Sequence, residues 1–125
     1  YPEYDDLPER ALVKVYCLNE IATEKVIALL DRARTEPRDL YDLWFLTSLE
    51  KRVNLRDCLD GIRAKLQYRG KSLNEVRGEF DNKEARLRKT WGSRLSVQMI
   101  NLPEFESVYR TVKRTLRQGK ITASS

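Results

Sequence analysis

The sequence predicts a mainly α-helical fold: a bundle of five or six helices with one short N-terminal strand, in a single domain over residues 1–125. Apolar residues recur at three- and four-residue spacing through most of the chain, and residue types that begin or end helices separate these segments. Residues 11–16, ALVKVY, differ from this pattern because apolar positions alternate among β-branched side chains. They predict the strand.

The first two predicted helices cover residues 18–33 and 35–50. Cys17 occupies the N-cap position of the first helix, and Thr35 that of the second. The second helix is apolar on all sides from Leu40 onward, so we expect it to be central and buried. The apolar face of the first helix is expected to hold Ile21, Val26, Leu29 and Leu30.

The remaining predicted helices also begin at recognisable positions. Asn54 precedes a helix over residues 55–69, and Ser72 precedes a helix over residues 73–80. The last two helices are expected to run from about Lys83 towards Met99 and from Pro103 onward, with apolar faces formed by Leu87, Trp91 and Leu95 and by Phe105, Val108, Val112 and Leu116.

Composition excludes several kinds of site. The chain has no histidine, which removes Ser-His-Asp and Cys-His nucleophile systems and histidine metal ligands from it. Cys17 and Cys58 lack metal-ligand spacing, and we expect reduced thiols in a cytoplasmic protein. No apolar run predicts a membrane span, and the N-terminal residues do not resemble a signal peptide. Because residue 1 is tyrosine rather than methionine and the first residues are polar, we expect a fragment of a longer protein.

Two carboxylates interrupt one of the most apolar stretches of the chain. In RDLYDLWFLT, residues 38–47, Asp39 and Asp42 are three residues apart and therefore share one side of a helix. Burying an ionised carboxylate costs several kcal/mol unless a cation or metal compensates it. The candidate counter-charges are Lys25, Arg32, Arg34 and Arg38, of which Lys25 and Arg32 are expected on one face of the preceding helix.

Three interpretations of these carboxylates are open from the residues alone. They can form a structural salt-bridge network between two helices, hold Mg²⁺, or belong to a nucleotide pocket in which lysine meets phosphates and an aspartate positions an attacking hydroxyl. Spacing does not choose between them.

Residues 15–46 resemble the second conserved region of the AbiEii/AbiGii nucleotidyltransferase toxins of type IV toxin-antitoxin and abortive-infection systems. Residues 91–112 are similar to the helical tail of the same family. The matching positions of the conserved region are Leu18, Glu20, Lys25, Arg38, Asp39, Asp42 and Leu43.

This resemblance implies the C-terminal part of a nucleotidyltransferase-fold α+β protein that transfers a nucleotidyl group from an NTP to an acceptor with Mg²⁺. In related toxins the acceptor is tRNA, and a cognate antitoxin is the protein partner. The resemblance assigns Lys25 to triphosphate binding and Asp39, with Asp42, to catalysis. We place Arg32 and Arg38 beside Lys25 as further nucleotide-binding residues.

The family's first conserved region, a Gly-Ser turn followed by paired acidic residues, has no counterpart in the sequence. Its Gly92-Ser93 pair lies late in the chain with no Asp-x-Asp after it. We therefore expect residues 1–50 to carry the second half of an active site and residues 51–125 to form a basic helical tail. This chain alone is expected to bind neither Mg²⁺ nor NTP and to be inactive, because an N-terminal nucleotidyltransferase half is missing.

Positive charge is concentrated in the second part of the chain. Residues 1–50 contain 6 Lys+Arg and 11 Asp+Glu, whereas residues 51–125 contain 18 and 8. On the last helix, basic residues recur opposite the apolar face, which indicates a solvated surface, an electrostatic surface for RNA, or a docking site for an acidic partner. These residues are Arg110, Lys113, Arg114 and Arg117. An alternative function is therefore a non-catalytic helical module that binds nucleic acid or a protein.

Overall fold

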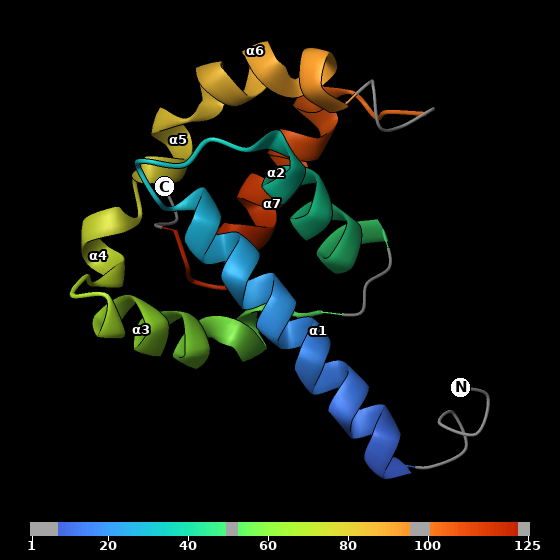
Figure 1. Cartoon of the computed structure of the whole chain (residues 1–125), viewed down its shortest axis with the longest axis vertical. Helices are drawn as coiled ribbons and strands as arrows, with labels where there is room; N and C mark the ends of the chain where they lie inside the picture. The colour runs from blue at the N-terminus through green and yellow to red at the C-terminus, as the bar shows by residue number, and fades with distance from the viewer. Residues whose placement is uncertain (1–7, 50–52, 96–100, 123–125) are drawn as a thin grey trace.

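The computed structural model describes residues 8–49, 53–95 and 101–122. The prediction of a mainly helical fold is confirmed, and no strand occurs in these three ranges (Figure 1). The elements are α1 (Pro8–Leu29), α2 (Pro37–Trp44), the π-helical segment η2 (Phe45–Leu49), the 3₁₀ turn η3 (Leu55–Cys58), α3 (Leu59–Tyr68), α4 (Leu73–Val76), α5 (Glu79–Asn82), α6 (Glu84–Leu95) and α7 (Phe105–Gln118).

The predicted N-terminal strand is wrong, because residues 11–16 lie inside α1. Pro8 is the first residue of α1, a position at which the fixed backbone φ of proline is favourable. A lone strand also has no partner for its backbone hydrogen bonds, whereas a helix satisfies its own. Cys17 therefore lies within α1 rather than at its N-cap.

The central position predicted for the second helix is confirmed. Helix α2 packs against α1, α6 and α7, and the side chains of Leu40 and Leu43 are fully buried. Glu36, not Thr35, is its N-cap, and the Glu36 carboxylate accepts a hydrogen bond from the Arg38 backbone N–H at 3.3 Å.

The α-helical geometry of this segment ends earlier than predicted. After Trp44 the chain continues as the π-helical turn η2, and residue 50 lies outside the described residues. The hydroxyl of Thr47 donates to the Leu43 carbonyl at 2.8 Å, a local bond of the kind that competes with regular helix hydrogen bonding.

Helix boundaries in the second part of the chain follow their capping residues. The Asn54 side chain accepts from the Arg56 backbone N–H at the start of η3, and Gly70 ends α3 with a φ of 75°. The predicted helix over residues 73–80 is interrupted at Gly78, a poor helix former, and is two short helices instead. The expected continuation of α6 towards Met99 falls outside the described residues.

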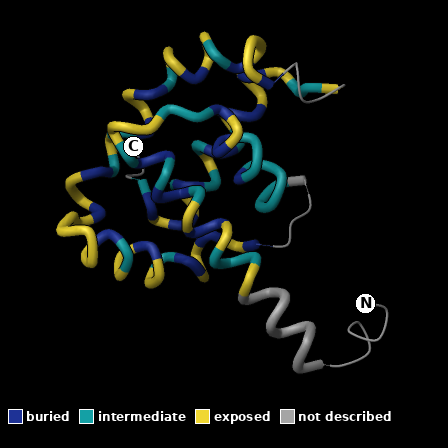
Figure 2. Tube along the Cα trace, in the orientation of Figure 1, coloured by how far each residue is buried: buried dark blue, intermediate teal, exposed yellow. Residues whose placement is uncertain are grey.

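Buried side chains gather where α1, α2 and α7 meet, while the outer sides of α3 and α6 are exposed (Figure 2). The predicted apolar faces of α6 and α7 are buried, and Trp91 donates its indole N–H to the Pro103 carbonyl at 2.9 Å. Ile21 is an exception to the predicted core, because its side chain is 47% exposed. Cys17 and Cys58 are both free thiols, as predicted. Among the described helices, none combines the length and apolar character that a membrane span needs.

Candidate functional site

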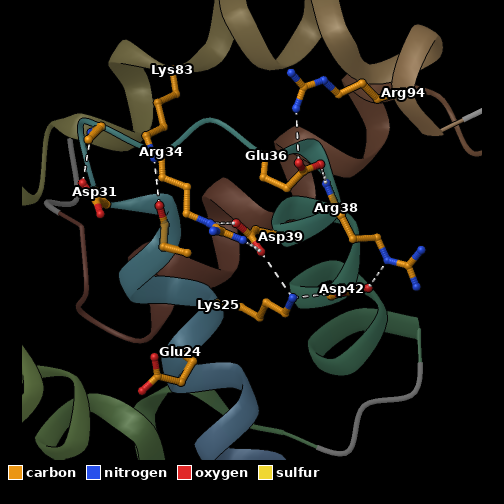
Figure 3. A network of polar contacts seen from close by, with 12 residues as sticks. Glu24, Lys25, Asp31, Arg34, Glu36, Arg38, Asp39, Asp42, Lys83 and Arg94 are labelled. Atoms are coloured by element: carbon orange, nitrogen blue, oxygen red, sulfur yellow. Dashed lines mark hydrogen bonds and ion pairs between the residues drawn. The ribbon is translucent and has the colours of Figure 1, made fainter.

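Lys25 joins the two aspartates that the sequence singled out. From α1 its Nζ lies 2.9 Å from Asp42 Oδ2 and 3.2 Å from Asp39 Oδ1, both on α2 (Figure 3). Asp39 is almost completely buried, with 3% of its side chain exposed, whereas Asp42 and Lys25 keep about a quarter of theirs in solvent. The prediction that both acids share one side of a helix and face Lys25 is therefore confirmed.

Two arginines complete the ion-pair network. Arg34, in the loop between α1 and α2, reaches Asp39 Oδ2 with Nε at 2.7 Å and Asp39 Oδ1 with Nη2 at 3.4 Å. Arg38 pairs with Asp42 Oδ1 through Nε at 3.0 Å, one helical turn along α2. All four carboxylate oxygens therefore accept from cationic side chains, which compensates the burial of Asp39.

The network sets the charge state of its lysine. Burial lowers the pKa of Lys25, but hydrogen bonding and the negative charge of Asp42, followed by those of Asp39, outweigh this and raise it above the usual value. Hydrogen bonding to Asp39, together with its charge, likewise raises the pKa of Arg34. Both side chains are therefore cations at physiological pH.

The buried side of this network faces an open cavity of about 360 Å³. Four segments of the chain contribute to it: α1, the loop between α1 and α2, α2 itself, and the end of α3. Its lining residues are Glu24, Lys25, Ile27, Ala28, Asp31, Arg34, Asp39 and Arg69.

Arg32 does not join this cluster. Helix α1 ends at Leu29, so the seven-residue spacing from Lys25 no longer places Arg32 on the same helical face. Its side chain is 82% exposed and lies 3.5 Å from Glu79, at the start of α5. Arg34, considered in the sequence only as a counter-charge, occupies the position beside Asp39 instead.

Lys83 is a further lysine beside the site that sequence reasoning left unassigned. It is 1% exposed and donates from Nζ to the Ala28 carbonyl at 2.8 Å, near the C-terminus of α1 (Figure 3). A signal was present in the sequence, because Lys83 is in phase with the buried stripe of Leu87 and Trp91. A charged residue in phase with an apolar stripe predicts a buried cation with a specific partner.

The basic residues of α7 lie on the side predicted for them, away from its buried face. Arg110 and Arg114 are exposed. Lys113 is engaged with Asp81 at 3.3 Å, whereas no ion pair of Arg110, Arg114 or Arg117 occurs within the described ranges. Among the described residues, three of the four cations therefore have no carboxylate partner.

The described residues do not provide the set of ligands that a Mg²⁺ site needs. None of the groups of His, Cys, Asp and Glu in residues 8–49, 53–95 and 101–122 places three or more ligands around one point. The oxygens of Asp39 and Asp42 are all occupied by lysine and arginine donors. Mg²⁺ prefers several oxygen ligands in octahedral arrangement, which this cluster does not supply.

Comparison with known families identifies the chain. The model of a family described as the nucleotidyl transferase AbiEii toxin of type IV TA systems matches residues 1–112. The chain belongs to the AbiEii family. Its resemblance to these toxins is thereby confirmed over most of the sequence, and not only over residues 15–46. No curated protein and no solved structure matches the chain.

Membership of the AbiEii family makes the protein a toxin of the nucleotidyltransferase type and implies an antitoxin partner. The ion-pair network lies within the part of the AbiEii match that runs from α1 into α2. The candidate site therefore lies inside the region that the family model matches.

Proposed function

We propose that this AbiEii protein contributes to nucleotidyl transfer from an NTP to a hydroxyl group of tRNA. The observation that carries the proposal is that Lys25 and Asp39 pair with each other in the lining of one cavity, while Asp42 pairs with the same lysine from the next turn of α2. A buried carboxylate next to a cation at a cavity is an arrangement that enzymes use to bind phosphate and to accept a proton.

In the proposed reaction, Lys25 binds phosphate oxygens of the NTP and Arg38 assists from the adjacent turn. The acceptor hydroxyl oxygen attacks the α-phosphorus and its proton passes to the Asp39 carboxylate, while the bond to the β-phosphate oxygen breaks and pyrophosphate leaves. Movement of Lys25 towards phosphate weakens its contact of 3.2 Å to Asp39 Oδ1. That oxygen then keeps only the longer contact to Arg34, at 3.4 Å, and can accept from the acceptor hydroxyl. Asp42, which is held by Arg38, retains its contact with Lys25 during this movement.

We also propose that transfer requires residues beyond those present here. The printed sequence contains no Gly-Ser turn followed by Asp-x-Asp, and the described residues do not form a Mg²⁺ site. The metal ligands are therefore assigned to an N-terminal nucleotidyltransferase half, and the 125 residues alone are proposed to be inactive. Tests of activity accordingly use the product of the complete gene.

A change of Lys25 to methionine is expected to raise the KM for NTP in nucleotidyl transfer to tRNA by about tenfold, because a charge-assisted contact to phosphate is lost. Lys89→Met is the control, since Lys89 is an exposed lysine of α6 that does not line the cavity. Transfer of labelled nucleotide at varied NTP concentration measures KM. Equal KM values in wild type and Lys25→Met would favour a purely structural salt-bridge network.

The basic side of α7 is proposed to bind the tRNA backbone. Binding to phosphates releases counterions, so affinity falls with salt in proportion to the cations engaged. Changing Arg110 and Arg114 to glutamine should lower the slope of log affinity against log salt by about two, measured by fluorescence anisotropy with labelled tRNA. Arg63→Gln with Lys71→Gln, an equally exposed pair, should leave the slope unchanged. An identical slope in both double variants would contradict this surface assignment.

A second candidate function is a non-catalytic helical module that binds nucleic acid or a protein partner. It is favoured by the full pairing of the Asp39 and Asp42 oxygens, which is how a structural network is arranged. The antitoxin is the partner that the family implies, and an acidic antitoxin surface would suit the basic side of α7. If the complete gene product had no transfer activity, the non-catalytic module would be the better account of the protein's function.

A further inference from the structure

Arg69 closes the cavity on the side of α3. It is the C-cap residue of that helix, with its backbone N–H bonded to the carbonyls of Lys65 and Leu66 at 3.2 and 3.0 Å. Gly70 follows with a φ of 75°, a conformation that glycine adopts readily, and turns the chain away. The backbone of Arg69 is therefore well fixed, while half of its side chain remains exposed.

The guanidinium of Arg69 is weakly engaged. Its contact is Nη2 to Glu24 Oε2 at 3.9 Å, and the other Glu24 oxygen is held by Lys65 at 2.5 Å. By comparison, Arg34 contacts Asp39 at 2.7 Å, and Lys25 has two carboxylate partners. Within the described part of the chain, Arg69 is thus the cation lining the cavity whose donors are least occupied.

The charges around the cavity favour an anion at this end. Lys25 and Arg34 neutralise Asp39, and Lys65 neutralises Glu24 from outside the cavity. Asp31 caps a turn by accepting from the Ala33 backbone N–H at 3.0 Å, and its charge disfavours an anion close by. Asp31 lies beyond the end of α1 at Leu29, whereas Lys25 lies within that helix, so the region between Lys25 and Arg69 is the more favourable part.

We propose that Arg69 binds a phosphate group of the nucleotide whose phosphates Lys25 also binds, so that the polyphosphate spans the cavity from α1 to α3. This inference rests on the proposed function. A planar guanidinium with free donors suits phosphate because it can donate two parallel hydrogen bonds to one group. Binding requires Arg69 to give up its long contact to Glu24, which is a weak one at 3.9 Å.

Inorganic tripolyphosphate is the probe for this inference, measured by titration calorimetry with the complete gene product. Arg69→Ala is expected to weaken binding by about fivefold, and Arg69→Lys to recover part of the loss. Glu24→Gln removes the competing carboxylate and is expected to tighten binding by about twofold. Arg63→Ala is the matched control, since Arg63 is exposed on the same helix and does not line this cavity.

The outcomes separate this inference from the proposed function. If Lys25→Met loses tripolyphosphate binding while Arg69→Ala binds as wild type does, the assignment of Arg69 is overturned and the proposed function stands. A loss in Arg63→Ala equal to that in Arg69→Ala also overturns it, because general electrostatic attraction would then explain both. If the wild-type protein does not bind the probe, or Lys25→Met binds it unchanged, the phosphate site itself is wrong and both proposals fail.

Discussion

Replacing Lys25 and Arg34 together by methionine is expected to lower the free energy of unfolding by about 3 to 5 kcal/mol. Either cation alone can continue to pair with Asp39, so each single change should cost only about 1 kcal/mol. The double change leaves a carboxylate whose side chain is 3% exposed without the two cations that contact it. Urea unfolding of the wild type, both single variants and the double variant measures the excess over additivity.

Glu24 provides a matched control for this experiment. It also lies between two cations, Lys65 and Arg69, but 49% of its side chain is exposed, so water can replace them. The double change Lys65→Met with Arg69→Met should therefore be additive and cost about 1 kcal/mol in total. Adding Asp39→Asn to the first double variant should recover at least half of its loss. Additive losses at Lys25 and Arg34, within about 0.5 kcal/mol, would show that these two cations do not hold Asp39.

Local chemistry explains which parts of the fold could be predicted. Asn54 marks the start of its segment by capping with its side chain, and Gly70 marks the end by its positive φ. The nearby sequence therefore contains the information that locates these two helix boundaries. Residues 11–16 were wrongly predicted because a six-residue alternation is too short to separate a strand from part of a long helix. The π-helical turn after Trp44 depends on packing that periodicity does not describe.

The candidate site divides in the same way. Asp39 and Asp42 could be placed together because their spacing fixes a common helical side, and a short connection brings Lys25 opposite them. Arg32 was misplaced because the sequence does not locate the end of α1 to within a few residues. The helix ends at Leu29, so Arg32 no longer shares the helical face of Lys25. Arg69 comes from a distant segment, so no local pattern indicates its position at the cavity.

The buried ammonium group of Lys83, beside this site, gives a second prediction, which concerns how stability depends on pH. Burial lowers the pKa of its ammonium to about 8, against the opposing attraction of Asp31 and Asp39. The Ala28 carbonyl that it contacts also accepts from the Asp31 backbone N–H, so this carbonyl keeps a partner if the lysine is removed. The buried ammonium is therefore a cost to stability that a methionine of similar length would not carry.

The sign of the pH dependence follows from where the protons are bound. Between pH 8 and 10.5 the unfolded chain holds the Lys83 proton more often than the folded chain, so the free energy of unfolding rises with pH. Below pH 8 both forms are protonated and the full cost of the buried charge is present. The stability of wild type relative to Lys83→Met should accordingly increase by about 2 kcal/mol between roughly pH 7 and 10.

Taking the difference between wild type and Lys83→Met cancels the titration of all other groups, and denaturant unfolding at a series of pH values measures it. Lys89→Met, at an exposed position of α6, should show no such change with pH. A difference between wild type and Lys83→Met that stays constant from neutral to alkaline pH would mean that Lys83 is hydrated in solution. The end of α1 would then be held by backbone bonds such as the one from Asp31 to Ala28, and the loop carrying Arg34 would keep its position without Lys83.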